Sequence, residues 1–389
     1  MTERLYYTDA YRTDFDALVV ARGDQGRRIY LDRTAFYPTS GGQPYDVGFL
    51  DDAPVQDVVD EGDRIAHLLA VPLAVERVRG RVDWPRRFDH MQQHTGQHLL
   101  SAVIADRFGF ETVSVHFGAE ASTLDLAVAA FSPDQALEAE LRANEVVTEN
   151  RPVFVSFEDA ASATGLRKPS ERSGTIRIVT IETLDRSACG GTHVRATGEI
   201  GPILIRRVER VKQQVRLEFL CGMRAVRRAH ADADLLARLA GAQSAAPDEL
   251  PALLEAQRAE LKTSSAARRE LEEMVARYRA RELYDAVAPN ASGRRVIVVR
   301  EEQGPVERLR PLGQALAGLP RAVFIGATAE PAAVVVAASA DADLDAGRRL
   351  KAALQRHGGR GGGNPRLAQG SVADSGAIDA VVAAVLEGY

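Results

Sequence analysis

Four residues in two short segments form a possible ligand set for a metal ion. His94 and His98 are four positions apart in one segment, and Cys189 and His193 are four positions apart in a distant one. Two side chains at that spacing on a helix lie on one face, close enough to share an ion. Three imidazoles and a thiolate suit Zn(II) in tetrahedral geometry. The two pairs together predict one zinc ion per chain, which also organises the chain between them.

Each pair has another interpretation when it is taken alone. Helical histidines at this spacing also serve in packing, and Cys189 could be a buried thiol beside a loop histidine. The zinc-protease motif is excluded, because it needs Glu directly after the first histidine and Thr95 stands there. His90 extends the histidine ladder. We interpret it as a support for the ligands or a helix-start residue, with replacement of one ligand as the alternative.

Composition limits the class of protein. The 389 residues predict two to four domains, and the net charge of −5 leaves only local basic patches for nucleic acid. The only two cysteines, Cys189 and Cys221, exclude a disulfide framework and suit a reducing cytosol. No apolar signal region or membrane-spanning run is present. We expect a soluble cytoplasmic protein with no membrane partner.

The pattern of strands and helices predicts an α+β multidomain protein with four blocks. Residues 1–85 are expected to form a small β-barrel and residues 86–222 an α/β zinc-binding core. Residues 223–289 are expected to form a helical, coiled-coil hairpin, and residues 290–389 a small α/β domain. Predicted barrel strands are Phe15–Ala21, Arg28–Leu31 and Val55–Val59.

A glycine-rich loop, Tyr37–Pro44, interrupts the barrel strands. One interpretation is a tight turn that needs positive φ at Gly41 or Gly42. The other is a close approach of the backbone and of Gln43 to a ligand. The loop taken alone favours the turn.

The second block is expected to hold a helix that carries the histidines and a second helix, Gln135–Asn150. Leu137, Leu141 and Val146 are predicted to form the apolar face of that second helix. Three further strands are predicted at Gly174–Ile181, Ile203–Val208 and Val215–Leu220, the last two as an antiparallel pair.

The same block contains a local basic cluster, which includes Arg206, Arg207, Arg210, Lys212 and Arg216. A run of charges is usually only a solvated face. Beside a site that processes RNA, the same side chains would contact phosphates.

The third block is predicted to be two helices, the first ending near Gly241. The second carries Leu250, Leu254, Leu261, Leu271, Val275 and Tyr278 at a spacing of mostly three or four. This pattern indicates an antiparallel coiled-coil hairpin, either as a spacer or as a homodimer interface. In the fourth block, strands are predicted at Val296–Val299, Ala322–Ile325 and Ala333–Ala338.

A second glycine-rich run, Gly358–Gly370, precedes a helix expected near Ser375. Such a loop can hold phosphate or RNA backbone through its N–H groups, and a flexible surface loop is the alternative. It matches neither the dinucleotide fingerprint nor the P-loop. The predicted RNA contacts here are Arg360, Gly362, Gly363, Asn364 and Arg366.

The motifs together carry a resemblance to a known family. The segments Thr34–Gln43, His94–Leu100 and Cys189–His193 closely resemble the editing domain of alanyl-tRNA synthetases and the free-standing AlaX proteins. The tail, Gly361–Gly370, is similar to the C-Ala domain that ends those synthetases. The chain thus resembles the long AlaX form over nearly its whole length. Ser40 departs from the family pattern, which usually has a third glycine there.

The resemblance implies an ATP-independent hydrolase that removes serine, and possibly glycine, from mischarged tRNA(Ala). His94, His98, Cys189 and His193 would be the zinc ligands. Thr39 would recognise the serine hydroxyl, and Gln43 would contact the substrate or the terminal adenosine. Since the chain starts at the barrel, no synthetase catalytic domain is expected, and therefore no amino-acid activation.

Direct attack of water on the ester is expected, because no Ser-His-Asp signature is visible and Cys189 suits a metal thiolate better than a nucleophile. Four protein ligands fill a tetrahedron, whereas catalytic zinc keeps one position open. The sequence leaves open whether zinc activates water or positions the aminoacyl group. Two alternatives remain: a deacylase of another tRNA such as Ser-tRNA(Thr), and a non-catalytic tRNA-binding or dimerisation module with structural zinc.

Overall fold

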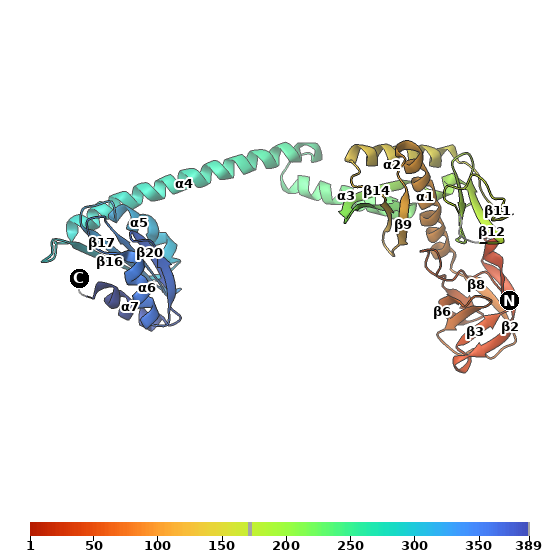
Figure 1. Cartoon of the computed structure of the whole chain (residues 1–389), viewed down its shortest axis with the longest axis horizontal. Helices are drawn as coiled ribbons and strands as arrows, with labels where there is room; N and C mark the ends of the chain where they lie inside the picture. The colour runs from red at the N-terminus through yellow and green to blue at the C-terminus, as the bar shows by residue number, and fades with distance from the viewer. Residues whose placement is uncertain (170–172, 388–389) are drawn as a thin grey trace. The chain divides into compact units, whose positions relative to one another are not determined.

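The chain folds into two compact units, Met1–Ala242 and Gln243–Tyr389 (Figure 1). The computed structural model describes residues 1–169 and 173–387. Each unit combines helices and sheets around hydrophobic cores of its own. The protein is therefore an α+β multidomain protein, as the sequence predicts.

Six strands of the first unit close into a barrel in the order β2-β3-β7-β6-β5-β8. Their bounds are Asp14–Gly23 (β2), Arg28–Leu31 (β3), Gly48–Leu50 (β5), Ala53–Asp60 (β6), Ile65–Leu69 (β7) and Arg77–Val82 (β8). A short parallel pair, β1 (Glu3–Arg4) and β4 (Arg33–Thr34), lies outside the barrel. In β8, buried and exposed residues alternate, because every second side chain of a strand points into the barrel.

Helix α1 (Trp84–Phe108) is the element that carries the two helical histidines. Asp83 caps its N-terminus by accepting a hydrogen bond from the Arg86 N–H (3.0 Å), and Gly109 ends it in the left-handed conformation. Most of the helix is buried, so it contacts protein on all sides. At Gly96 a Cβ atom would lie 2.2 Å from the Cys221 sulfur, which explains the glycine within a helix.

A buried ion pair fixes α1 to the barrel. Arg87 and Asp46 are both fully buried, and the Arg87 Nε lies 3.0 Å from the Asp46 carboxylate. The guanidinium also donates to the carbonyls of Ala10 (2.8 Å) and Ala35 (2.6 Å). The same carboxylate accepts a hydrogen bond from the backbone N–H of Tyr37. The first turn of the histidine helix and the glycine-rich loop are thereby held together.

Helix α2 (Pro133–Glu149) buries a different face from the predicted one. Leu137 and Leu141 are more than half exposed, and Val146 is buried as expected. The buried face consists of Ala136, Ala139, Ala143 and Val146. Small residues at heptad-like spacing let two helices approach closely, and α2 packs on α1 along this face.

Two antiparallel sheets complete the first unit. One has the order β11-β12-β13 and the other β14-β15-β10-β9. Their bounds are Thr112–Phe117 (β9), Ser122–Leu126 (β10), Val153–Asp159 (β11), Thr175–Ile181 (β12), Asp185–Ala188 (β13), Ile203–Val211 (β14) and Gln214–Cys221 (β15). The predicted antiparallel pairing of the last two strands is confirmed. Helix α3 (Met223–Ala242) follows directly.

The second unit begins with the long helix α4 (Leu250–Ala286). Leu254, Leu261, Leu271, Val275 and Tyr278 are all exposed on it. The pairing of α3 and α4 in a coiled coil stays a prediction. No helix in residues 1–169 and 173–387 combines the length and the apolar character needed to cross a bilayer.

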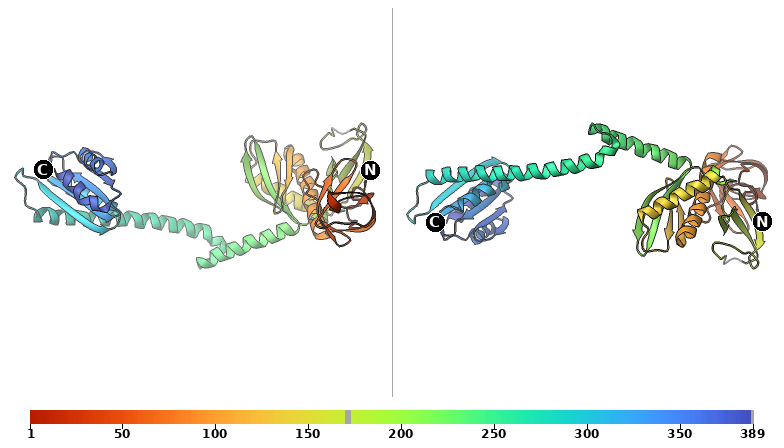
Figure 2. Two further views of the ribbon diagram at one scale, coloured as in Figure 1. Left: turned by 90° about the horizontal axis from the view of Figure 1, so that it is seen from below. Right: turned by 90° about the horizontal axis from the view of Figure 1, so that it is seen from above.

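A five-stranded sheet with the order β16-β17-β18-β20-β19 forms the centre of the second unit, with helices on both faces (Figure 2). The bounds are Arg295–Gln303 (β16), Ala322–Glu330 (β17), Ala333–Ala338 (β18), Arg360–Gly363 (β19), Leu367–Ser371 (β20), Arg310–Leu316 (α5), Ala346–Arg356 (α6) and Ile378–Leu386 (α7). Helices α6 and α7 cover one face, and α5 with the end of α4 covers the other.

The second glycine-rich run forms a β-hairpin, not the loop that the sequence suggests. Strands β19 and β20 pair antiparallel at the edge of the sheet. A Cβ atom at Gly361 would lie 2.4 Å from the Gly370 Cα, and one at Gly363 would lie 2.3 Å from the Leu367 carbonyl oxygen. These glycines are required because the two backbones pass too close for side chains.

We predict that Asp46→Asn destabilises the first unit by about 3–5 kcal/mol, because it leaves the buried Arg87 charge without its counter-ion. Asp14→Asn breaks an exposed pair with Arg79 and should cost less than about 1 kcal/mol. Urea unfolding of both variants measures the difference. Equal midpoints for the two would contradict the role assigned to the buried pair.

Candidate metal centre

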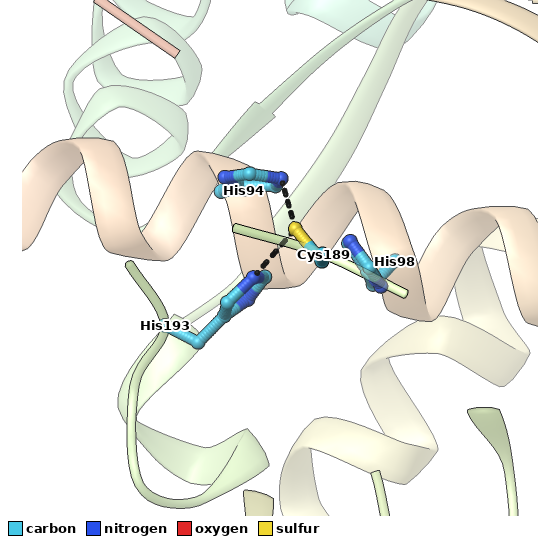
Figure 3. Close-up of side chains that lie close together, drawn as sticks. All are labelled: His94, His98, Cys189 and His193. Carbon is cyan, nitrogen blue, oxygen red and sulfur yellow. Dashed lines mark hydrogen bonds between the residues drawn. The ribbon is translucent and has the colours of Figure 1, made fainter. Parts of the chain in front are cut away.

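The four predicted ligands meet at one point (Figure 3). Their ligand atoms all lie within 4.8 Å of one another. The Cys189 Sγ is 3.4 Å from the Nε2 atoms of both His94 and His193. Ordinary zinc–sulfur and zinc–nitrogen bond lengths at a tetrahedral angle give an S···N separation of about 3.6 Å. The cluster therefore has both the donor set and the spacing of a site that can hold a metal ion.

Each imidazole of the cluster is oriented by a hydrogen bond at its other nitrogen. The Nδ1 atoms of His94, His98 and His193 have three different partners. These are the Gln43 Oε1 (2.9 Å), the Asp185 Oδ2 (2.9 Å) and the Thr95 Oγ1 (3.1 Å), respectively. An oxygen partner at Nδ1 fixes the proton there and leaves Nε2 free to bind a metal.

The Asp185 carboxylate is the charged member of this set. It is buried and also accepts hydrogen bonds from the Arg167 Nε (2.7 Å) and the Ser187 hydroxyl. Burial by itself raises the pKa of Asp185, but the hydrogen bond from His98 and the Arg167 charge lower that pKa to about 2. Asp185 is therefore a carboxylate throughout the physiological pH range, and His98 keeps its orientation.

The segment that carries Cys189 is anchored through its backbone. The Arg177 guanidinium donates to the Cys189 carbonyl (2.7 Å), and the Cys189 N–H donates to the Arg177 carbonyl. A Cβ atom at Gly191 would lie 2.1 Å from the His94 ring, so only glycine lets this loop pass. Although burial alone raises it, the neighbouring His94 and His193 lower the pKa of the Cys189 thiol well below its ordinary value. A thiolate is the form that binds metals.

The first glycine-rich loop is a two-residue hairpin turn. Ser40 and Gln43 exchange two backbone hydrogen bonds, and both Gly41 (φ +57°) and Gly42 (φ +84°) have positive φ. This is the turn that the sequence predicts, and it requires glycine at both central positions. Ser40 itself is outside the positive-φ region, so a third glycine is not needed there.

Thr39 and Gln43 differ in their exposure to solvent. The Thr39 side chain is exposed, and its hydroxyl accepts a hydrogen bond from the Tyr45 N–H (3.2 Å). Gln43 is fully buried. Its Oε1 accepts from His94 and from the Thr192 N–H (3.1 Å), and its Nε2 donates to the Thr192 hydroxyl (2.7 Å). In this structure Gln43 positions His94, and its contact with the substrate or the terminal adenosine stays a prediction.

His90 is outside the metal cluster. It lies one helical turn before His94, is 6% exposed and is not among the grouped ligands. Burial and the nearby Arg86 lower the pKa of His90 to about 4. Among the described residues, the ligand group is complete without His90, which argues against the alternative in which His90 replaces a ligand. Its role as a support for the ligands stays a prediction.

The predicted RNA contacts are scattered. Arg206 is paired with Glu218 and lines a cavity, Arg207 is paired with Glu209, and the Arg210 side chain donates to the Lys212 carbonyl. In the second unit, Arg360, Gly362 and Gly363 are exposed on β19.

Two other predicted contacts have structural partners. The Asn364 Oδ1 accepts from the N–H groups of Arg366 and Leu367 and so closes the hairpin turn. The Arg366 guanidinium donates to the carbonyls of Ala338 (2.8 Å) and Ala317 (2.9 Å). Both side chains hold the fold of the second unit in this structure.

Three supporting residues are not identified from the sequence: Asp185, Thr95 and Thr192. Thr95 directly follows His94 and Thr192 directly precedes His193, so their positions next to ligands could have indicated a supporting role. Asp185 is four residues before Cys189, and nothing in its sequence context distinguishes it from other acidic residues. Only the fold brings it to His98.

Sequence similarity to known proteins identifies the family of the chain. An alanyl-tRNA editing protein AlaX-M from Methanosarcina acetivorans is 40% identical over 54% of this chain and 94% of its own length. An AlaX-L protein from Pyrococcus horikoshii is 32% identical, over 70% of each chain. The chain belongs to the AlaX family of alanyl-tRNA editing proteins.

Other relatives of this AlaX protein are larger. An alanine–tRNA ligase from Methanoregula boonei is 33% identical over 95% of the chain, which spans only 41% of that ligase. The family described as threonyl and alanyl tRNA synthetase second additional domain matches residues 176–217. The solved C-Ala domain from Aquifex aeolicus alanyl-tRNA synthetase covers 26% of the chain and 96% of its own, at 20% identity and a TM-score of 0.22, too low to support an argument.

We predict that Asp185→Asn weakens Zn(II) binding about 10–100-fold, because an amide orients and polarises His98 less well than a carboxylate. Glu182→Gln, an exposed change near the same strand, should leave the affinity unchanged. Competition with a chromophoric chelator at constant pH measures both. An unchanged zinc affinity in Asp185→Asn would contradict the orienting role.

Proposed function

We propose that this AlaX protein hydrolyses the ester of serine, and secondarily of glycine, wrongly attached to tRNA(Ala), without activating amino acids. One observation carries the proposal. The cluster of three oriented imidazoles and a thiolate is joined through Gln43 to a hairpin that presents Thr39. A metal centre and an exposed hydroxyl are thereby fixed relative to each other. Because its substrate belongs to translation, we expect the reaction in the cytoplasm.

Selection for serine would depend on Thr39. An apolar pocket discriminates poorly against one added hydroxyl, whereas a site that hydrogen-bonds that hydroxyl strongly favours the substrate that has it. The Thr39 side chain is exposed, and its oxygen has one bond, from the Tyr45 N–H. A hydroxyl can donate one hydrogen bond and accept two, so Thr39 retains capacity for a serine hydroxyl.

The ligands fit Zn(II), with His94, His98, Cys189 and His193 as the residues that would hold it. A zinc ion at this position would supply Lewis-acid polarisation of an oxygen. In the hydrolysis, water adds to the ester carbonyl carbon, the bond from that carbon to the ribose oxygen breaks, and the ribose oxygen leaves with a proton. Gln43, Asp185 and Thr95 keep the three rings in one arrangement during this process.

The second unit would bind a part of the tRNA other than its charged end. The exposed edge strand β19 carries Arg360 beside bare glycines, which offer backbone groups to a phosphate. The exposed apolar residues of α4 support either a spacer or a homodimer contact. The phosphate contact at β19 and the role of α4 both depend on the substrate being a tRNA.

A second substrate has an observation in its favour. The family match at residues 176–217 covers the threonyl as well as the alanyl synthetase domain. Ser-tRNA(Thr) is therefore the competing substrate, and it contains the same serine ester on a different tRNA. A tRNA-binding module with structural zinc would cleave neither.

We predict that the zinc-loaded protein releases serine from Ser-tRNA(Ala) faster than from Ser-tRNA(Thr) and spares Ala-tRNA(Ala). His98→Ala should lower the rate at least about 100-fold, because it removes one ligand. His230→Ala, an exposed histidine of α3, is the matched control. Release of labelled serine is the measurement. Binding of tRNA without any hydrolysis would instead indicate the structural-zinc module.

Thr39→Val should reduce the preference for Ser-tRNA(Ala) over Ala-tRNA(Ala) by about 10–100-fold, because valine keeps the shape but lacks the hydroxyl. Thr39→Ser should retain most of the preference. The ratio of kcat/KM values for the two esters measures it. If Thr39→Val discriminates as well as the wild type, another group reads the serine hydroxyl.

A further inference from the structure

A cavity of about 1020 Å³ lies in the first unit beside the metal cluster. Its wall comes from the start of α1, the turn between β9 and β10, the end of β15, and α3. Five arginines and two carboxylates give this lining a formal charge of +3, although the whole chain has a net charge of −5. The arginines are Arg86, Arg206, Arg224, Arg227 and Arg228, and the acids are Asp89 and Glu120. We call this cavity the arginine cavity.

Two of these cations lack a carboxylate partner in the described part of the chain. Arg206, Arg224 and Arg228 are paired with Glu218, Asp89 and Asp232. The Arg86 guanidinium donates to the neutral carbonyl of Tyr45 (3.2 Å) and lies over the Tyr45 ring. The Arg227 side chain is exposed on α3 and has neither an ion pair nor a hydrogen bond among the described residues. Two guanidinium groups are therefore available to an anion in the arginine cavity.

His90 gives a second, independent indication of a ligand. Its side chain is 94% buried and lines the arginine cavity. Its Nδ1 atom is buried and has no hydrogen-bond partner among residues 1–169 and 173–387. Buried polar atoms are nearly always bonded, and an unbonded one is costly. A polar ligand that enters beside His90 would remove this cost.

The arginine cavity adjoins the metal cluster through three segments. His90 is one helical turn before His94 on α1. Pro44, also in the lining, directly follows Gln43, which is bonded to His94. Ala119 is two residues after Phe117, whose ring centre lies 5.0 Å from that of His94. The wall of the cavity thus shares α1, the glycine-rich hairpin and the turn after β9 with the surroundings of His94.

We propose that the arginine cavity binds a backbone phosphate of the RNA strand whose 3′ ester reaches the metal cluster. Arg86 and Arg227 pair with the phosphate oxygens, and His90 supplies a hydrogen bond. This inference rests on the proposed function. A phosphate fits because guanidinium groups bind its oxygens in a bidentate way. The cavity volume is also large enough for a nucleotide.

Binding of an uncharged acceptor-stem RNA that ends in CCA tests the proposal without hydrolysis. Fluorescence anisotropy with the full, zinc-loaded chain measures Kd at a series of salt concentrations from about 50 to 200 mM. Arg227→Gln should weaken binding about ten-fold and reduce the slope of log K against log salt by about 0.7–0.9, the value for one lost phosphate contact. Arg227→Lys should restore part of the affinity. Arg27→Gln, an exposed arginine near the barrel, is the control.

His90→Phe keeps an aromatic ring at this position, although a larger one, and removes the polar atoms. It should also weaken RNA binding about ten-fold at unchanged zinc content. For both Arg227→Gln and His90→Phe, the loss of kcat/KM should be at least ten-fold greater for Ser-tRNA(Ala) than for a seryl ester of adenosine, which has no phosphate.

Two outcomes separate this inference from the proposed function. If wild type hydrolyses Ser-tRNA(Ala) but Arg227→Gln and His90→Phe keep its RNA affinity and salt slope, the phosphate site is wrong and the deacylase proposal stands. If wild type cleaves no ester while both variants still weaken RNA binding, the arginine cavity is an RNA site and the deacylase proposal fails.

Discussion

The three imidazoles of the cluster must direct their Nε2 atoms to the same point, and three parts of the first unit are needed to hold them so. Each Nδ1 has an oxygen partner from a different part of the chain: the barrel hairpin, the helix itself and strand β13. If any partner were lost, its ring could rotate and the ligand set would be incomplete. The site is therefore a product of the barrel, helix α1 and the β11-β12-β13 sheet acting together.

Burial makes this arrangement rigid, but it also requires that every polar group in it has a hydrogen-bond partner. Asp185, Gln43 and the Arg87–Asp46 pair are removed from water, so each must find its hydrogen bonds within the protein. Because they find them, the first turn of α1, the glycine-rich hairpin and the cysteine loop are held at fixed separations. Gly191 lets the cysteine loop pass close to His94, and Gly41 and Gly42 allow the positive φ angles of the hairpin turn.

Exposed groups have a different role. Thr39 reaches solvent, and the guanidinium groups of Arg86 and Arg227, which have no carboxylate partner among the described residues, line a cavity. A substrate could contact all three. The buried contacts hold the metal-ligand side chains in fixed positions. The exposed groups remain available to bind a substrate. The chain belongs to the AlaX family of alanyl-tRNA editing proteins, and the roles proposed for these exposed groups rest on that membership.

The sequence by itself predicted the four residues that cluster, three of the barrel strands, the histidine helix and the hairpin turn, because spacing and glycine chemistry are local properties. It also indicated the family. That the cluster binds zinc stays a prediction. Only the tertiary structure decided that Gln43 supports His94, that Asp185 orients His98, and that the second glycine-rich run is a hairpin. It also reversed the expected face of α2, where alanines instead of Leu137 and Leu141 are buried. The contacts of Gln43 and Asp185 and the buried face of α2 depend on which distant segments approach each other, and that information is not contained in any one segment. The glycine-rich hairpin pairs locally, but it is held in place at the edge of a sheet whose other strands are distant in the chain.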